Sequence, residues 1–137
     1  EYTERKCLVE AIYFEGRSES VLAQLAIANV ILERVKQPAF PDTVCKVVRA
    51  GRYYKGNPIR NKCAFSYWCD GKSEKMYNKN AKEIAIEVAT MAVKGVLVDS
   101  TMYATHYHAT YVYPYWARHY TFEIIGQLGF HIFYIQN

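Results

Sequence analysis

The first 37 residues of the chain place apolar side chains at the spacing of an α-helix. In residues 4–15 they fall at i, i+3 and i+4, the pattern of a helix with one face in the core. A second segment with this pattern begins after Ser18 or Ser20, either of which can cap a helix, and ends near Gln37, just before Pro38. Two consecutive helices are therefore the strongest constraint on the fold.

Two further helices are expected in the middle of the chain. One is short and covers residues 43–50, with Asp42 as its cap. The other is long and runs from Asn78 or Asn80 through Lys94. The region between them is irregular and rich in Gly, Asn, Lys and aromatic residues.

Extended patterns are confined to the second half of the chain. We expect a short hairpin around "CAFSYWCDG" (63–71). Further on, "MYATHYHATYVYPYW" (102–116) alternates like a strand, and "FHIFYI" (130–135) is typical of another. The sequence predicts an α+β fold, with helices first and a small sheet or extended segments after them.

Length and composition indicate one folded domain over residues 1–137. Half of the residues (51%) are apolar, and no linker or internal repeat interrupts the chain. The longest apolar run, 21–32, contains Gln24 and Asn29 and is shorter than the roughly 20 residues that span a bilayer. We therefore predict no transmembrane segment. The first residue is Glu1 and not Met, which suggests a processed amino terminus without a signal peptide.

The net charge of +4 favours an anionic partner. Nucleic acid, an anionic glycan and a membrane surface all fit this charge, and an ordinary solvated surface also explains scattered basic residues. The sequence has no Gly-rich phosphate loop and no nucleic-acid-binding signature, so we predict no nucleic-acid partner. The 13 Tyr, six Phe and two Trp suit either a core or a cleft in which rings stack on sugars.

Four cysteines, Cys7, Cys45, Cys63 and Cys69, allow three disulfide connectivities. Their even number suits one or two disulfides in an oxidising compartment. Buried free thiols are an alternative. A zinc site is a further alternative, although the spacing of Cys63 and Cys69 is wider than in usual zinc motifs.

One carboxylate interrupts the apolar face of the first helix. Glu15 lies in line with Leu8 and Ile12, whereas Glu10 and Arg17 fall on the opposite side, where charges are expected. Burial among apolar side chains raises the pKa of a carboxyl group, because desolvation disfavours its charged form. Such a group stays protonated near neutral pH and can act as a general acid. The alternative is an exposed glutamate where the helix frays, or one paired with an arginine.

A second carboxylate is less clearly indicated. Glu19 would face the same cleft as Glu15 if the first helix continued, and two such acids could form the pair of a glycosidase. Acids close to the start of a helix more often stabilise its amino terminus, so a capping role for Glu19 is an alternative. Asp70 is another candidate for the second acid.

The histidines and cysteines offer two further kinds of site. His106 and His108 lie two apart in a predicted strand and share one face, as metal ligands can. No third ligand has a diagnostic spacing, so we predict hydrogen-bonded histidines and no metal site. Cys63 or Cys69 paired with His106 would make an amidase or peptidase, but neither cysteine lies in a recognisable nucleophile motif.

Six stretches resemble the SleB/CwlJ family of cell wall hydrolases. In chain order they are "IYFEGRSES", "QLAIANVILERV", "FPDTVCKVV", "CAFSYWCDG", "ATHYHATYVYPYW" and "IGQLGFHIFY". They follow the order of the family and cover nearly the whole chain. The resemblance implies a compact, lysozyme-like α+β domain that acts on peptidoglycan without a cofactor.

The resemblance also implies roles for individual residues. Glu15 matches the catalytic glutamate of the family, and Glu19 matches the second acid of the same stretch. The family is considered to act as lytic transglycosylases, which cut between N-acetylmuramic acid and N-acetylglucosamine and leave a 1,6-anhydro end. Candidate substrate-binding residues in the matching stretches are Gln24, Tyr67, Trp68, His106, Tyr107 and Trp116.

This sequence departs from the family pattern at several positions, which bears on glycan-strand specificity. The departures are Gly16, Ser18, Glu33, Ala64 and Tyr113. We expect a monomer of bacterial or phage origin that acts at the cell wall, in the periplasm or outside the cell. Two other functions stay open: a non-catalytic peptidoglycan-binding module, and a hydrolytic muramidase that uses a second carboxylate.

Overall fold

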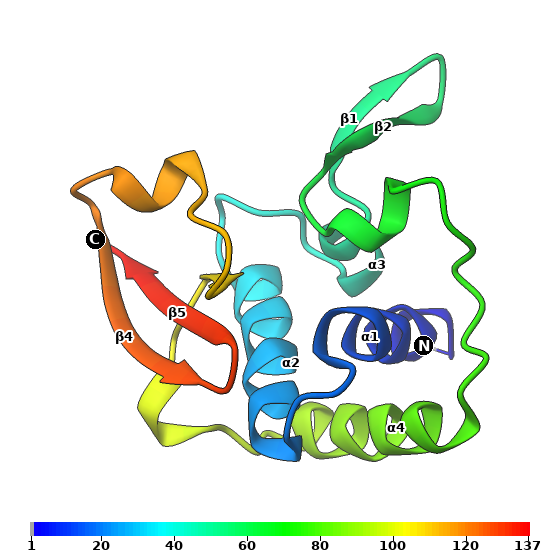
Figure 1. The fold of residues 1–137 in the computed structure, drawn as a ribbon, viewed down its shortest axis with the longest axis horizontal. Coiled ribbons are helices and arrows are strands. Elements are labelled where there is room, and N and C mark those ends of the chain that lie inside the picture. Colours follow the sequence, from blue (N-terminus) through cyan, green and yellow to red (C-terminus); the bar gives the residue numbers. More distant parts are fainter. Residues whose placement is uncertain (1) are drawn as a thin grey trace.

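Three long helices form the helical part of the fold: α1 (Tyr2–Gly16), α2 (Val21–Lys36) and α4 (Lys79–Val93). They pack against one another in pairs in the computed structural model, which describes residues 2–137. The short helix α3 (Val44–Val48) packs on α1 and α2. In the view of Figure 1, α4 runs beneath α1 and ends beside the lower end of α2, and a three-stranded sheet lies on the side of α2 opposite α1.

Side chains that the sequence supplies set the starts of these helices. Ser20 caps α2, because its hydroxyl accepts a hydrogen bond from the amide three residues on at 3.1 Å. Asn78 caps α4 in the same way, at 2.9 Å. The cap of α3 is Thr43 and not Asp42, so the prediction for this helix is wrong by one residue. Thr43 has the extended backbone of a cap, and its hydroxyl lies 3.2 Å from the third amide of the helix.

The apolar face predicted for α1 is buried, since Leu8 and Ile12 are at most 1% exposed. The spacing predicts a stripe on α2 made of Val21, Leu25, Ala28, Leu32 and Val35, and this prediction is right only in part. Leu25 and Ala28 are buried, but Val21 is 49% exposed, and Ile27 and Ile31, which lie off the stripe, have no exposed surface. Phe133, from the last strand, is fully buried in the same core. The helical period therefore identifies the core face of α1 correctly and that of α2 only in part.

Glu10 is an exception to the predicted charge pattern. Only 7% of its surface is exposed, and its Oε1 accepts a hydrogen bond from the Tyr67 hydroxyl at 3.1 Å. The prediction that Glu10 faces water is wrong because the 3-10 helix η1 (Ser66–Cys69) packs on this side of α1. Burial raises the pKa of Glu10, and the hydrogen bond from Tyr67 and the charge of Arg49 oppose that effect. Arg17 is exposed, as predicted.

Replacing the buried acid, Glu10→Gln, is expected to stabilise the fold near neutral pH. The pKa of Glu10 is higher in the folded chain than its ordinary value of 4.5, so ionisation costs folding stability once the pH rises above that value. Glutamine accepts the same hydrogen bond from Tyr67 and stays neutral. Thermal unfolding should give the variant a higher Tm near neutral pH, and the difference should shrink as the pH falls towards 4.5. A Tm at neutral pH no higher than that of the parent contradicts this account.

The three-stranded sheet is antiparallel, with the strand order β3-β5-β4. Its strands are β3 (His106–Ala109), β4 (Phe122–Leu128) and β5 (His131–Gln136). Of the long strand predicted over 102–116, only the four residues of β3 form a strand. The chain turns after Ala109, whose carbonyl accepts a hydrogen bond from the Val112 amide at 3.2 Å, and Pro114 then leads into the 3-10 helix η3 (Tyr115–Arg118). The "FHIFYI" prediction is confirmed by β5, whereas β4 was not predicted.

A two-stranded hairpin precedes the segment in which one was predicted. Its strands are β1 (Gly51–Tyr54) and β2 (Asn57–Cys63), and it projects from the top of the molecule in Figure 1. The two turn residues, Lys55 and Gly56, have φ angles of 50° and 83°, as the tight turns of β-hairpins require. The prediction of a hairpin at "CAFSYWCDG" is therefore wrong, since those residues end β2 and form η1.

All four cysteines are joined in disulfides. Cys7 of α1 is bonded to Cys45 of α3, and Cys63 at the end of β2 is bonded to Cys69 of η1. The disulfide prediction is confirmed, and the alternatives of free thiols and a four-cysteine zinc site are wrong. Within residues 2–137, no helix has the length and apolar character needed to cross a membrane.

Candidate active site

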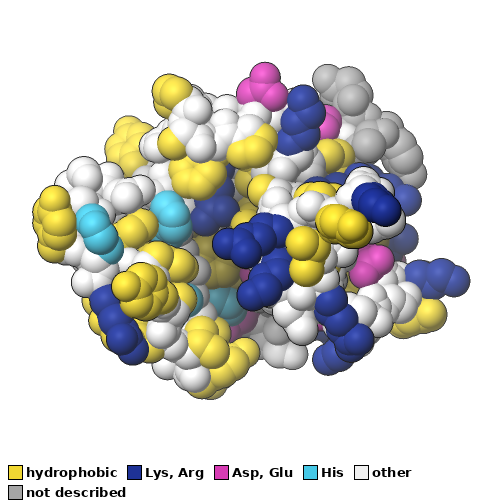
Figure 2. All heavy atoms as spheres, turned by 90° about the horizontal axis from the view of Figure 1, so that it is seen from above, with side chains coloured by type: hydrophobic (Ala, Val, Ile, Leu, Met, Phe, Trp, Pro, Cys, Tyr) yellow, Lys and Arg dark blue, Asp and Glu magenta, His cyan; other side chains and the backbone are white. Residues whose placement is uncertain are grey.

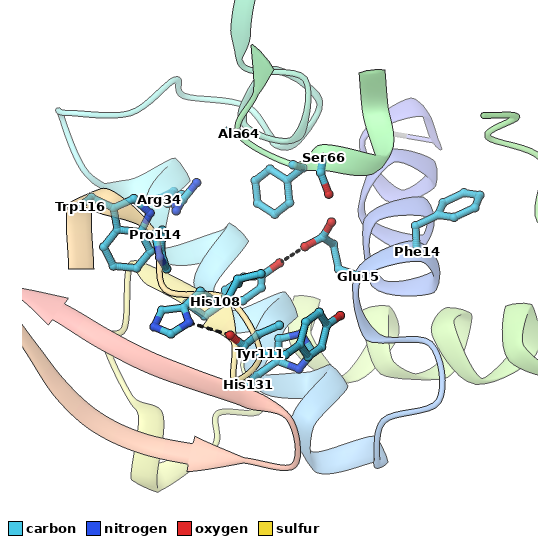
Figure 3. Close-up of a pocket in the computed structure, with 14 residues that line it drawn as sticks. Phe14, Glu15, Arg34, Ala64, Ser66, His108, Tyr111, Pro114, Trp116 and His131 are labelled. Atoms are coloured by element: carbon cyan, nitrogen blue, oxygen red, sulfur yellow. Dashed lines mark hydrogen bonds between the residues drawn. The ribbon is translucent and has the colours of Figure 1, made fainter. Parts of the chain in front are cut away.

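Glu15 lies in the last turn of α1, where the chain turns towards α2. The end of α1 packs closely on α2, since a Cβ at Gly16 would come within 2.9 Å of the Gln24 side chain. This packing fixes the helix end and directs Glu15 into a cleft of about 510 Å³ (Figure 3). The unusual position of Glu15 on an apolar helix face thus places a half-buried carboxyl group on the wall of a cavity.

Tyr107 of β3 is the hydrogen-bonding partner of Glu15. Its hydroxyl donates to Glu15 Oε1 at 2.7 Å, across 92 residues of sequence. Side chains alternate along a strand, so Tyr107 faces the opposite way from His106 and His108, both of which pack on Trp116. Burial and the neighbouring Glu15 raise the pKa of Tyr107 well above its ordinary value, which keeps it a protonated donor.

Burial also raises the pKa of Glu15, and this is the largest effect on the group. The hydrogen bond from Tyr107 and the charge of Arg34 lower the same pKa and partly compensate. Arg34, from α2, lines the cleft, and its Nε donates to the Thr105 carbonyl at 2.7 Å. The site therefore favours a protonated Glu15, yet it provides a donor and a cation for the carboxylate that forms when the proton leaves.

A second cavity of about 250 Å³ adjoins the cleft at Glu15. The residues that line both cavities are Phe14, Glu15, Tyr111 and His131. The second cavity extends over the turn between α1 and α2, whereas the cleft extends towards η3 and Trp116. A chain-like ligand that occupied both would pass directly over the Glu15 carboxyl group.

Glu19 is already bound by the start of β5. Its Oε2 accepts a hydrogen bond from the Phe130 amide at 3.0 Å, and His131 Nδ1 lies at the same distance. Burial lowers the pKa of His131 although Glu19 raises it, so the neutral ring donates through Nδ1–H. At Gly129, a Cβ would overlap the Glu19 carboxylate. Glu19 therefore joins the α1–α2 turn to the β4–β5 turn.

The model of the Cell Wall Hydrolase family matches residues 18–134. The chain belongs to the Cell Wall Hydrolase family. This finding confirms the resemblance found in the sequence. The matched range begins after Glu15, so the family match itself does not include this residue.

Two solved structures are similar to this family member over nearly the whole chain. One is the catalytic domain of the germination-specific lytic transglycosylase SleB from Bacillus anthracis, with a TM-score of 0.70 and 28% identity over 96% of this chain and 93% of that one. The other is the catalytic domain of SleB from Bacillus cereus, with a TM-score of 0.71 and 28% identity over 98% and 91%. Both confirm the predicted α+β fold class.

Curated relatives include spore cortex-lytic enzymes. That of Bacillus subtilis strain 168 is 33% identical over 82 residues, which are 60% of this chain and 23% of the relative. That of Bacillus cereus is 34% identical over 80 residues, which are 58% of this chain and 27% of the relative. The match thus spans about a quarter of the length of these relatives.

The predicted substrate-binding residues of this Cell Wall Hydrolase domain fall into two groups. Tyr107 and Trp116 line the cleft. The others lie outside the lining of both cavities at Glu15: Gln24, Tyr67, Trp68 and His106. Gln24 donates to the Glu19 carbonyl, Trp68 donates to the Tyr53 hydroxyl, and His106 packs among Phe40, Trp116 and Phe122.

The cleft also contains side chains that the sequence did not single out as substrate-binding. These are Arg34, Ser66, His108, Tyr111 and His131. All five belong to stretches that resemble the family, which is the signal that could have found them. Periodicity alone could not, because it does not say which exposed residues of different segments meet.

Two alternative chemistries lose their basis in the structure. Cys63 and Cys69 are bonded to each other, so neither is a thiol that His106 could activate. Among the described residues, no group of three or more His, Cys, Asp or Glu is placed to hold a metal ion. Asp70 accepts a hydrogen bond from the Lys72 amide and does not line either cavity at Glu15.

Proposed function

We propose that this domain cleaves the glycan strands of peptidoglycan as a lytic transglycosylase, between N-acetylmuramic acid and N-acetylglucosamine. The observation that carries the proposal is a single carboxyl group, Glu15, with a raised pKa and a tyrosine donor at the junction of two cavities. The family membership and the similarity to SleB catalytic domains support the same substrate.

In the first step, protonated Glu15 donates its proton to the oxygen of the glycosidic bond. The bond between this oxygen and C1 of the muramic acid breaks, and the other sugar leaves as an alcohol. Positive charge develops at C1, and Glu15 is left as a carboxylate. Tyr107 and Arg34 stabilise that carboxylate, since one donates a hydrogen bond to it and the other supplies a nearby positive charge.

In the second step, the Glu15 carboxylate acts as a base. It accepts the proton of the C6 hydroxyl of the same muramic acid while the hydroxyl oxygen attacks C1 and closes the 1,6-anhydro ring. Glu15 is protonated again, and no water is consumed. One carboxyl group therefore serves both steps, provided that its pKa is tuned by its surroundings.

The hydrolytic alternative needs a second carboxylate to activate water. Among the residues lining the two cavities, the other carboxylate is Glu19, and its Oε2 is engaged by the amide of Phe130 and by His131. These bonds give Glu19 a role in joining two turns and favour the mechanism without water. We further propose that the domain acts at the cell wall as a monomer.

The experiment compares the parent with Glu15→Gln on purified, insoluble peptidoglycan. The release of soluble glycan fragments is measured beside the amount of protein that co-sediments with the wall. The proposal predicts glycan fragments from the parent only, with both proteins bound. Binding by both without release by either would identify a binding module, and cleaved stem peptides on intact glycan would identify an amidase.

Tyr107→Phe is expected to move the pH dependence of cleavage upwards. The hydrogen bond from Tyr107 favours ionised Glu15, so its loss raises the pKa of Glu15 further. Cleavage needs protonated Glu15 and is lost as the pH rises through that pKa. The alkaline limb of kcat/KM should therefore shift to higher pH, whereas Tyr77→Phe, at an exposed tyrosine, should leave it in place. An unmoved or lowered limb in Tyr107→Phe contradicts the role given to this hydrogen bond.

A further inference from the structure

All of the excess positive charge of the protein lies in the β1–β2 hairpin. Residues 51–63 contain Arg52, Lys55, Arg60 and Lys62 and no acidic residue. The chain has 17 basic and 13 acidic side chains, so removing these four leaves 13 of each sign. The rest of the molecule is formally neutral, and the charge that favours an anionic partner belongs to one element.

The hairpin contributes almost nothing to the core. Every residue of β1 is exposed, and so are five of the seven residues of β2. All four cations are exposed, including Lys55 in the turn. A two-stranded hairpin is only marginally stable in water on its own. Because this hairpin buries so little surface, packing against the core does not account for its stability. Lys55 even occupies the left-handed turn position, with φ of 50°, which asparagine or glycine would fill at lower cost. A binding role explains a basic residue there.

The base of the hairpin is fixed rigidly to the molecule. The Cys63–Cys69 disulfide joins the end of β2 to η1, and the Ala64 amide donates to the Ala50 carbonyl at 2.9 Å. Gly51 packs so tightly that a Cβ there would come within 2.7 Å of the Cys63 Cα. The charged strands therefore have a defined position relative to the remainder of the protein.

That position is beside the cleft. The residues that directly follow β2, Ala64, Phe65 and Ser66, form the wall of the cleft opposite β3. Figure 3 shows the chain descending from β2 to Ala64 and Ser66 above Glu15. Figure 2, seen from above, shows dark blue Lys and Arg side chains gathered beside the hollow. A polymer that leaves the cleft on this side would pass the base of the charged hairpin.

We propose that the hairpin binds the carboxylates of the stem peptides that branch from the glycan strand in the cleft. The inference rests on the proposed function, because the glycan determines which anions come close. Stem-peptide carboxyl groups have ordinary pKa values near 4 and are ionised at neutral pH, so they complement the four cations. The hairpin would favour strands that still carry their peptides over bare strands.

None of the stretches that resemble the family includes residues 51–62. The Cys63 that begins the "CAFSYWCDG" stretch is also the last residue of β2, so the hairpin leads directly into the cleft wall. The range matched by the family model, 18–134, includes the hairpin. The proposal therefore assigns peptide recognition to a segment of this chain that the catalytic chemistry does not use.

Two matched variants separate the effect of the hairpin cations on peptidoglycan binding from the effect of net charge. The first combines Arg52→Gln, Lys55→Asn, Arg60→Gln and Lys62→Gln. The control combines Lys36→Gln, Lys46→Gln, Lys79→Gln and Lys94→Gln, which are exposed lysines on the helices and their ends. Each set removes four of the 17 basic side chains, so the two variants have the same net charge. Both sets are made in the Glu15→Gln background, so that the wall is not consumed during the measurement.

The experiment measures co-sedimentation with peptidoglycan that has been freed of phosphate-containing polymers. One portion keeps its free carboxylates, and in the other they are coupled to glycinamide and are neutral. The hairpin variant should bind the untreated wall about tenfold more weakly than its parent at low salt, as expected for a few exposed charge pairs. On the neutralised wall the two should bind alike, and the lysine control should match the parent on both.

Two results would overturn the proposal. One is equal binding of the parent to untreated and neutralised walls, which would mean that stem-peptide carboxylates are not the ligand. The other is an equal loss in the lysine control, which would mean that net charge alone matters. The binding assay uses proteins that carry Glu15→Gln and does not depend on cleavage. If the proposed function is wrong, the protein with Glu15 intact will release no glycan fragments, and this result is separate from the binding results.

Discussion

Replacing the central carboxyl group, Glu15→Gln, is expected to lower the rate of glycan cleavage by about 10²- to 10⁴-fold, the range for loss of a general acid–base. Glutamine has nearly the same shape and can still accept the hydrogen bond from Tyr107, but it can neither donate the first proton nor accept the second. The measurement is the initial rate of soluble fragment release at equal enzyme concentration. Glu87→Gln, an exposed acid on α4, is the matched control and should keep the parental rate.

Loss of activity in Glu15→Gln should not come from loss of structure. The pKa of Glu15 is raised in the folded protein, so its ionisation disfavours folding above its ordinary value of 4.5. Glutamine removes that cost, and the Tm of the variant near neutral pH should equal or exceed that of the parent. A variant that keeps the parental rate would refute the role of Glu15. An inactive variant with a lowered Tm would mean that unfolding, and not the missing carboxyl group, caused the loss of activity.

Removing the Cys7–Cys45 disulfide is expected to lower the free energy of unfolding more than removing the Cys63–Cys69 disulfide. The bond closes a loop of 38 residues, and the chain-entropy model gives it about 4 kcal/mol. The Cys63–Cys69 bond closes only six residues, for which the same model gives about 2 kcal/mol. The double variant Cys7→Ala/Cys45→Ala should therefore lose about twice as much free energy of unfolding as Cys63→Ala/Cys69→Ala, measured by urea denaturation.

The location of the two bonds predicts different functional effects as well. Cys7 is buried in the core between α1 and α3, so its loss should act on the whole fold. Cys63 and Cys69 flank the residues that line one side of the cleft. Their loss should therefore weaken binding to peptidoglycan while causing only the smaller loss of stability. If the short loop proves to be the more stabilising, the entropic explanation for both bonds is wrong.

The sequence predicts those features that depend on local spacing. The helical period identifies α1 and α2, the core face of α1 and part of the core face of α2. It also singles out Glu15, because a carboxylate on an apolar stripe is exceptional. It does not predict the Tyr107 partner, since 92 residues separate the two and only the packing of β3 on the helices brings them together. The period also predicts, wrongly, that Glu10 is exposed to solvent. Glu10 is covered by η1, which comes from a distant part of the sequence.

The strands were harder to predict than the helices. The hairpin is exposed on both faces, so its sequence lacks the alternation that marks a half-buried strand, and its turn has Lys55 where Asn is the usual signal. Residues 102–116 show the opposite error, in which the sequence alternates like a strand but the chain turns after Ala109. Four of these residues are extended, Ala104 and Thr105 are buried just before them, and several of those that follow line the cleft.

The most direct test of the account is mass spectrometry of the sugar ends left by digestion of purified peptidoglycan in ¹⁸O-labelled water. A single Glu15 acting as acid and then as base predicts fragments that end in 1,6-anhydro-muramic acid, carry no ¹⁸O and disappear in Glu15→Gln. Reducing muramic acid ends labelled with ¹⁸O would contradict it, because water and not the C6 hydroxyl would then be the nucleophile and a second carboxylate would have to activate it.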